Sequence, residues 1–261
     1  MDVEIRSLTT VEELQQISEV EKEVWNLPPL PIHQTLTVAK NGGIILGAYL
    51  EEKLIGFLYS FPGFDGNSTY LCSHMLGILP QYQRCGIGAK MKFEQAKLAK
   101  QLGYRLITWT YDPLESKNAY FNLHKLGAKG AQYKENYYGY LQDKLNKDLP
   151  TDRIIIEWNL DEEKVEREVE INEDNLLITV NENGLPNVTN QFDELDQTDR
   201  SYWVVTIPSD FQQMKKTNKD LARTWRFTTR KLFQQLFSLE YEAIDIEPEE
   251  TYSHYIFTKR V

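Results

Sequence analysis

The sequence predicts a mixed α/β fold in which helices cover a sheet of both parallel and antiparallel strands. Three observations predict it. Short apolar stretches bounded by turn residues recur along the chain. Between residues 70 and 139 these stretches alternate with segments of helical periodicity. The composition, 41% hydrophobic and 26% charged over 261 residues, is that of a globular protein with a substantial core.

The first half of the chain is expected to carry most of the strands. Thr9 and Thr10 offer N-caps to the first helix, and residues Glu51–Lys53 form the turn of a hairpin. Pro and Gly residues mark most other element ends. We expect strands at 3–8, 43–50, 54–61, 70–79, 105–111, 130–139 and 153–160, and helices at 11–25, 33–41, 87–102 and 116–126.

The second half changes character at residue 161. Residues 161–200 include a charged run and turn-rich segments, which indicates a connector with a surface hairpin whose weak strand is 176–180. After it we expect strands at 202–207, 241–246 and 253–259 and a helix at 210–238, interrupted near Thr217-Asn218. We therefore predict two domains, 1–160 and a smaller α/β domain at 161–261. The order of elements in the second domain also allows a degenerate structural repeat, although no sequence repeat of fixed period accompanies it.

Charge and composition exclude several classes of function. A net charge of −10 argues against nucleic acid as a partner, since phosphates need a basic surface. No apolar run reaches the roughly 20 residues that span a bilayer, and the N-terminus has no apolar segment of a signal peptide. The two cysteines, Cys72 and Cys85, lack metal-ligand spacing, so we expect free thiols, no metal site and a cytoplasmic protein.

A loop with two glycines joins the strand at 70–79 to the helix at 87–102. Gly86 and Gly88 let the backbone lie directly against a ligand, and the N–H groups of residues 84–89 open a helix whose dipole favours an anion. This arrangement suits a pyrophosphate. Arg84 and Lys90 or Lys92 could add positive charge. A tight strand-to-helix turn without a ligand is the alternative, while the patterns of Rossmann and P-loop sites are absent.

The loop Gln83-Arg-Cys-Gly86-Ile-Gly88 resembles the Gln/Arg-x-x-Gly-x-Gly/Ala motif of the GCN5-related N-acetyltransferases, the GNAT superfamily. The segment from Ser116 to Ala128 resembles the second motif of that superfamily. The resemblance covers residues 3 to 160, and several aromatic stretches look like a branch of predicted acyltransferases with an added C-terminal half, some linked to N-succinylation of amino acids.

The resemblance implies an acyl-CoA cofactor, either acetyl-CoA or another acyl-CoA such as succinyl-CoA. The pyrophosphate would lie on the amides of the loop, and the pantetheine would pair with the backbone of the preceding strand. Two residues of the second motif would flank the pantetheine or the acyl group. The implied cofactor-binding residues are Leu76, Ile78, Gln83, Arg84, Cys85, Gly86, Ile87, Gly88, Ala89, Asn118 and Tyr120.

Acyl transfer to an amine needs a base and an acid. His74 titrates in the useful range, and a strand period of two places it on one face with Leu76 and Ile78, so it is the candidate base. A half-buried structural histidine is the alternative. In the family a Tyr usually serves as the acid, and the matching position in this sequence is Leu123. The resemblance therefore does not identify the acid. Tyr138 is our candidate for that role, with Tyr111, Tyr120 and Tyr137 as alternatives; a nucleophilic Cys72 is a further, less economical reading.

Charged residues outside the loop could hold the substrate. Asp112 and Glu115 follow a strand and could bind an ammonium group, with solvated loop carboxylates as the alternative. Arg226 shares a helix face with Arg223 and Arg230 and could clamp a carboxylate, although salt bridges within this acidic chain would explain the three arginines equally well.

These observations predict an N-acyltransferase that moves an acetyl or succinyl group directly from CoA to the amine of a small molecule such as an amino acid. The C-terminal half would pack on the first half and close the substrate cleft, in a monomer or homodimer. A non-catalytic CoA-binding regulatory module and a protein N-acetyltransferase are the alternative functions.

Overall fold

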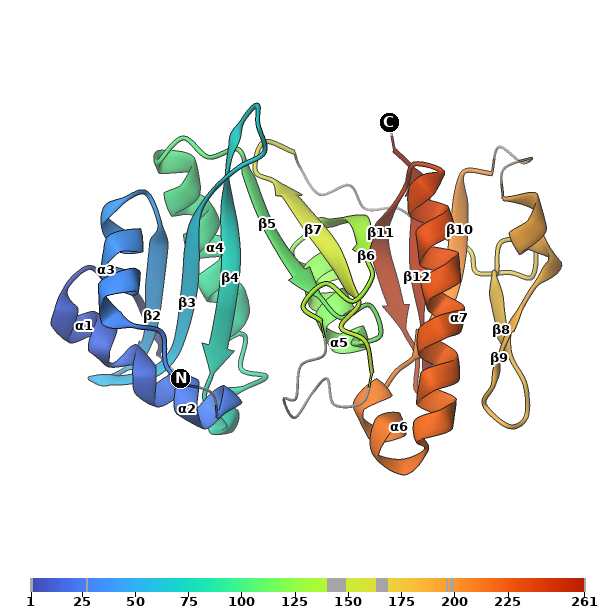
Figure 1. The fold of residues 1–261 in the computed structure, drawn as a ribbon, viewed down its shortest axis with the longest axis horizontal. Helices are drawn as coiled ribbons and strands as arrows, with labels where there is room; N and C mark the ends of the chain where they lie inside the picture. The colour runs from blue at the N-terminus through green and yellow to red at the C-terminus, as the bar shows by residue number, and fades with distance from the viewer. Residues whose placement is uncertain are drawn as a thin grey trace. The chain divides into compact units, whose positions relative to one another are not determined.

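The computed structural model describes residues 2–26, 28–139, 149–162, 169–195, 197 and 200–260 (Figure 1). The chain divides into two compact units. Unit 1 consists of Met1–Trp109 and Trp158–Glu162, and unit 2 of Thr110–Glu157 and Glu163–Val261. This division differs from the expected domain boundary at 160/161. The domain expected at residues 1–160 therefore stays a prediction.

Unit 1 is built on a mixed sheet with the strand order β1-β2-β3-β4-β5. Neighbours from β1 to β4 are antiparallel, whereas β4 and β5 are parallel. Most side chains of β2 and β3 are buried because helices cover both faces of this sheet. The strands are β1 (Glu4–Ser7), β2 (Ile44–Leu50), β3 (Lys53–Phe64), β4 (Thr69–Ile78) and β5 (Leu106–Tyr111), the last of which continues into unit 2.

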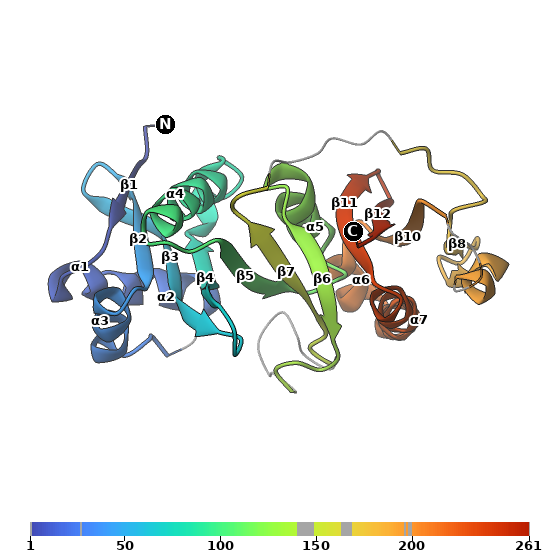
Figure 2. The same cartoon turned by 90° about the horizontal axis from the view of Figure 1, so that it is seen from above.

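The helices of unit 1 lie on both faces of its sheet. Figure 2 shows α4 on one face and α2 and α3 on the other. The expected N-cap is present at Thr10, whose Oγ1 accepts from the amide of Glu13 at 3.3 Å while the Glu13 carboxylate accepts from the Thr10 amide at 3.0 Å. The helices are α1 (Val11–Gln15), α2 (Ile17–Trp25), α3 (Ile32–Lys40) and α4 (Ile87–Gln101), with a 3₁₀ turn at Pro80–Tyr82.

Unit 2 carries five antiparallel strands in the order β7-β6-β11-β12-β10. Its core is aromatic: Trp203, Trp225, Phe233, Tyr255 and Phe257 are fully buried. Figure 2 shows α7 on one face of these strands and α5 on the other. The strands are β6 (Lys129–Lys134), β7 (Arg153–Asn159), β10 (Tyr202–Pro208), β11 (Tyr241–Pro248) and β12 (Tyr252–Lys259).

Capping side chains explain where the helices of unit 2 begin. The carboxylate of Asp210 accepts from the amide of Gln213 at 2.9 Å, and the side chain of Asn218 accepts from the amide of Leu221 at 3.1 Å. The second cap produces the interruption expected near Thr217-Asn218. The helices are α5 (Ser116–Ala119), a π-helical segment (Tyr120–Lys125), α6 (Phe211–Thr217) and α7 (Lys219–Ser238).

The connector contains the expected surface hairpin, formed by β8 (Ile178–Val180) and β9 (Pro186–Val188), and a 3₁₀ segment at Asn190–Glu194. Residues 163–168 of its charged run and Leu27 of the predicted helix break lie outside the described residues. The helix expected at 116–126 is present as α5 followed directly by the π-helical segment, whereas the strand expected at 130–139 ends at Lys134. None of the described helices is long and apolar enough to cross a bilayer.

Candidate active site

The loop between β4 and α4 has the backbone geometry that its glycines predict. Gly86 is the N-cap of α4 and has a φ of 76°, and Arg84 also has a positive φ of 63°. A Cβ at Gly86 would meet nothing within 4 Å, so Gly is needed there for backbone conformation and not for packing. Ile87 is only 2% exposed and anchors the start of the helix in unit 1.

The amides of this loop have no hydrogen-bond acceptor within the described part of the chain. The first helical bond of α4 runs from Lys90 N to Gly86 O at 3.2 Å, and no side chain caps the helix. The amides of residues 84–89 therefore donate to no described protein group. Residues 83–86 are exposed. A cluster of free N–H groups at the start of a 15-residue helix is a site for an anion.

Strands β4 and β5 pair over only two positions. The parallel ladder joins Leu71 to Ile107 and Cys72 to Thr108, while β4 continues to Ile78. The amide of Leu79 bonds to Ile55 O at 2.9 Å on the β3 side. Because backbone groups alternate along a strand, Leu76 and Ile78 direct theirs to the opposite edge. Among the described residues of unit 1, no strand pairs with Leu76 or Ile78 on that edge, although the Gln83 side chain donates to Ile78 O at 3.0 Å.

A β-bulge in β4 overturns the expected placement of His74. Tyr59 faces Met75 and Ser60 faces Ser73, so His74 is an extra residue without a partner on β3. The bulge reverses the alternation of side chains. His74 consequently lies on the same face as Tyr59 and Phe61, and Leu76 and Ile78 are on the opposite face. The prediction that the three side chains share a face was wrong, since it assumed a regular period of two.

The surroundings of His74 favour its neutral form. Its ring lies edge-on to Tyr59 with centroids 6.3 Å apart and tilted against Phe61 at 5.7 Å, while the residue stays exposed on its other side. This partial desolvation lowers the pKa of His74. On the same face, burial raises the pKa of the Cys72 thiol, which disfavours the thiolate that a nucleophile would need.

Lys92 does not belong to the loop, contrary to one expectation. It is 2% exposed and its Nζ lies 2.9 Å from Ser73 Oγ, on the side of α4 that packs on the sheet. Lys90 remains exposed near the loop. A helical spacing of four from Ile87 through Met91 and Gln95 marks the buried face of α4, and Lys92 is adjacent to it. This spacing was the sequence signal that could have indicated the burial of Lys92.

In unit 2, Asp112 and Arg226 lie together. Arg226 Nη2 donates to Asp112 Oδ1 at 2.7 Å and to Oδ2 at 2.6 Å, and the amide of Leu114 donates to Oδ1 at 2.9 Å. Burial alone would raise the pKa of Asp112, but the charge and hydrogen bond of Arg226 hold it below its ordinary value. The ion pair is the alternative foreseen for Arg226. Its Nε and Nη1 are nevertheless buried without a partner among the described residues.

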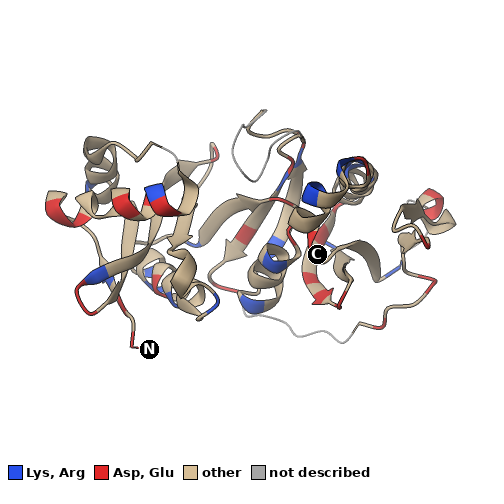
Figure 3. Cartoon of the chain, turned by 90° about the horizontal axis from the view of Figure 1, so that it is seen from below, with Lys and Arg blue, Asp and Glu red and all other residues tan. Residues whose placement is uncertain are grey.

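The other arginines of α7 do not share one role, although cations gather along this helix (Figure 3). Arg230 forms two bonds of 2.9 Å with Asp152, one from Nε and one from Nη2, and also pairs with Glu135. Arg223 is exposed and lies over the Phe227 ring. Asp152, which is fully buried, was absent from the sequence-based site because nothing local distinguishes it.

Glu115 is held by Gln212 of α6, whose side-chain amide donates to its carboxylate. Burial and then the neighbouring Asp112 charge raise the pKa of Glu115. The alternative for Asp112 and Glu115 was that both are solvated loop carboxylates. The structure contradicts it, because both carboxylates are hydrogen-bonded to side chains of unit 2. An ammonium group bound beside Glu115 would lower this pKa again, because a neighbouring positive charge favours the charged carboxylate.

The remaining predicted residues lie in unit 2. The Tyr138 hydroxyl is 3.1 Å from Thr110 Oγ1, and its ring, 43% exposed, faces the Arg153 guanidinium at 5.3 Å. Asn118 is exposed on α5. Tyr120 stacks on the His124 ring with centroids 4.6 Å apart. The His124 Nδ1 lies 3.0 Å from Asp245 Oδ1, a pairing that no sequence pattern indicates.

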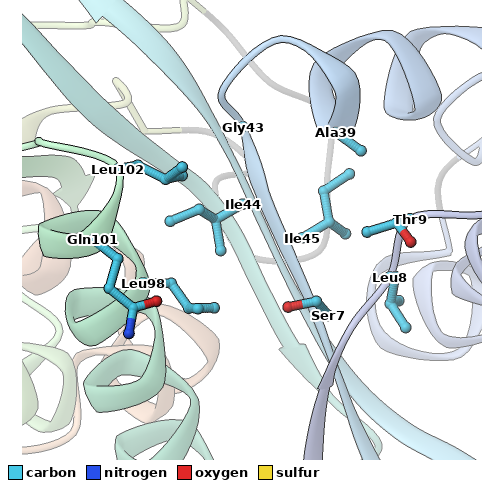
Figure 4. A pocket seen from close by; sticks show the side chains of 10 residues that line it. All are labelled: Ser7, Leu8, Thr9, Ala39, Gly43, Ile44, Ile45, Leu98, Gln101 and Leu102. Atoms are coloured by element: carbon cyan, nitrogen blue, oxygen red, sulfur yellow. The ribbon is translucent and has the colours of Figure 1, made fainter.

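A separate hollow of unit 1 is poorly suited to catalysis. Figure 4 shows this pocket of about 160 Å³ between β1, β2, the end of α3 and the end of α4. Its lining has no acid or base and is Ser7, Leu8, Thr9, Ala39, Gly43, Ile44, Ile45, Leu98, Gln101 and Leu102. Across the described ranges, no group of three or more His, Cys, Asp or Glu residues is placed to hold a metal ion.

Comparisons with known proteins agree with this geometry. Residues 9–127 match the model of the acetyltransferase (GNAT) family. The ribosomal-protein-S18-alanine N-acetyltransferase of Escherichia coli is similar in structure, with 16% identity, a TM-score of 0.51 and coverage of 65% of this chain and 100% of its own. An N-acetyltransferase of Staphylococcus aureus Mu50 has 18% identity, a TM-score of 0.50 and coverage of 61% and 99%. No curated protein sequence matches the chain. The match to the acetyltransferase (GNAT) family model is thus confined to residues 9–127, and the two solved structures show that the chain shares the fold of these N-acetyltransferases.

Proposed function

We propose that this protein is an acyltransferase that moves an acetyl or succinyl group from CoA directly to the amine of a small molecule such as an amino acid. The observation that carries the proposal is the set of uncapped amides at residues 84–89. A pyrophosphate would accept from these N–H groups, and the helix dipole of α4 would stabilise its charge. Arg84 and Lys90, which are both exposed, would add charge at the rim of this site.

The open edge of β4 supports the position of the pantetheine. Its amide groups would pair with the free backbone of Leu76 and the N–H of Ile78, as an added strand does. Asn118 and Tyr120 are proposed to flank the pantetheine or the acyl end. When bound, the cofactor would supply a thioester as the acyl donor.

His74 is proposed as the base that removes a proton from the acceptor ammonium. Its lowered pKa favours the neutral imidazole that this role requires. The bulge leaves the side chain exposed, within reach of a ligand on its own face of the sheet.

Tyr138 is proposed as the acid that protonates the departing thiolate. Its exposure and its single hydroxyl contact with Thr110 leave the phenol available for this step.

Asp112, Glu115 and Arg226 are proposed to hold the acceptor. The two buried, unpartnered nitrogens of Arg226 support a carboxylate-bearing acceptor such as an amino acid. We further propose a monomer or homodimer that acts in the cytoplasm, where its two free cysteines would stay reduced.

A substitution at Gly86 tests the cofactor site. Gly86→Asp places a carboxylate beside the proposed pyrophosphate and strains a backbone with a φ of 76°. We expect the Kd for CoA, measured by isothermal titration calorimetry, to rise at least about tenfold, which is about 1.4 kcal/mol.

Gly66→Asp is the matched control. Gly66 also has a positive φ, 99°, and open space around its Cα, but it lies in the turn before β4. This variant should bind CoA as the unaltered protein does. Equal CoA affinity of Gly86→Asp and the unaltered protein would contradict the proposed site.

The absence of the family's tyrosine gives one rival function specific support. Leu123 occupies that position, and its fully buried alkyl side chain has no proton to donate. A CoA-binding regulatory module would bind acyl-CoA without turnover. Release of CoA thiol, measured with panels of amino acids and of N-terminal peptides, separates this module from an enzyme and a small-molecule acceptor from a protein acceptor.

A further inference from the structure

Lys92 is a buried amine in the interior of unit 1. It projects from α4 toward the sheet, is 2% exposed, and has its Nζ 3.5 Å from the centroid of the Trp109 ring and 2.9 Å from Ser73 Oγ. Gln95, which is fully buried, bonds to the same hydroxyl at 3.0 Å. Polar side chains thus replace apolar packing at this point between helix and sheet.

Lys92 has no carboxylate partner among the described residues. Its polar contacts are the Ser73 hydroxyl and the face of the indole, and the thiol of Cys72 is the titratable group whose charge acts on it. Burial holds the pKa of Lys92 well below its ordinary value. A buried ammonium without a counter-ion is costly, so the site as it stands favours the neutral amine and would gain from an anion.

The location of the amine relates it to the proposed cofactor. The last pair of the β4–β5 ladder is Cys72 with Thr108. Ser73 and Trp109, the two residues that Lys92 contacts, come directly after that pair in their strands. Lys92 therefore lies where the strands stop pairing, at the closed end of the gap proposed for the pantetheine. The thioester is at the end of the pantetheine, so its acyl chain would extend into this region.

We propose that Lys92 selects an acyl-CoA whose acyl chain ends in a carboxylate, by pairing its ammonium with that carboxylate. Ser73 and Gln95 orient the amine, and the Trp109 ring stabilises its charged form. A succinyl chain has the required chemistry, whereas an acetyl group leaves the amine without a counter-ion. The proposal rests on the proposed function and assigns the acyl class of the same site.

Two measurements with the full chain test this assignment. Isothermal titration calorimetry gives the Kd of succinyl-CoA and of acetyl-CoA for the unaltered protein and for Lys92→Met, which keeps an unbranched side chain but removes the amine. We expect the unaltered protein to prefer succinyl-CoA by at least about tenfold and Lys92→Met to lose that preference while binding acetyl-CoA unchanged. Lys100→Met, at an exposed position near the C-terminal end of the same helix, should keep it.

Proton uptake is the second readout. Repeating the titrations in buffers of different ionisation enthalpy should show uptake of protons with succinyl-CoA and none with acetyl-CoA, because the carboxylate restores the charge on Lys92. If Lys92→Met does not fold, the proton uptake of the unaltered protein is by itself sufficient to test the assignment. Equal affinity for the two ligands, or preference retained in Lys92→Met, would overturn the assignment while leaving the acyltransferase intact. Failure of both ligands to bind would overturn the proposed function as well.

Discussion

Single residues show how local backbone geometry changes the meaning of a sequence pattern. Gly86 behaves as its neighbours predict, because a positive φ at a helix N-cap depends only on the adjacent peptide units. His74 does not, because one extra residue relative to β3 turns its side chain to the other face of the sheet. A bulge requires a partner strand, so no property of β4 alone reveals it.

A pH profile tests the role of His74. Since desolvation lowers its pKa, the base is neutral down to a lower pH than an ordinary histidine. We expect kcat/KM to fall in acid with a midpoint below the ordinary value of 6.5. His74→Asn should lower kcat/KM by about 10²-fold or more and remove this acid limb. His33→Asn, at an exposed position on α3, should change neither, and an acid limb that persists in His74→Asn would exclude this histidine as the base.

Whole elements are tied together by buried charges in unit 2. Arg226 connects α7 to the loop after β5 through Asp112, and Arg230 connects α7 to the start of β7 through Asp152. Such pairs contribute little net stability compared with apolar packing, but the loss of one partner is costly because it leaves a buried charge unpaired. The helix is therefore held in register by its arginines as well as by its apolar face.

Removal of the Arg226 charge should destabilise the protein. Arg226→Met leaves Asp112 buried without its main partner, and we expect urea denaturation at pH 7 to show a loss of about 3–5 kcal/mol. Burial is then opposed only by the Leu114 amide and the Arg153 charge, so the pKa of Asp112 should rise. The loss should consequently shrink as the pH falls through that raised pKa, because the protonated acid needs no partner.

Arg223→Met provides the control on the same helix. Its exposed side chain should change the free energy of unfolding by no more than about 0.5 kcal/mol. If Arg226→Met and Arg223→Met were equally stable at pH 7, the ion pair would have no structural importance.

At the scale of the whole molecule, the two halves of the sequence do not correspond to the two compact units. Unit 2 combines residues 110–157 with the C-terminal half. The Tyr111 and Tyr255 hydroxyls are 2.9 Å apart, and the Ser116 and Ser253 hydroxyls are 2.7 Å apart. Residues from the first half thus complete a core that is mainly supplied by the second.

A fragment of residues 1–160 tests this interdependence. It would lack Arg226, Ser253 and Tyr255 and expose apolar surface on the remaining part of unit 2. We expect no cooperative thermal transition by circular dichroism, or one far below that of the full chain. A fragment that melts cooperatively at the temperature of the full chain would show that the expected domain 1–160 is self-sufficient.

The sequence by itself determined the order and type of nearly all described elements, the loop at 83–89 and the family resemblance. These depend on local periodicity, caps and backbone freedom, which short stretches encode. The tertiary structure alone decided the side of the sheet on which His74 lies, the burial of Lys92 beside Ser73 and Trp109, and the partners of Arg226 and Arg230. Each of these depends on contacts between segments far apart in the chain, where the energy of burial and of charge pairing outweighs any local preference.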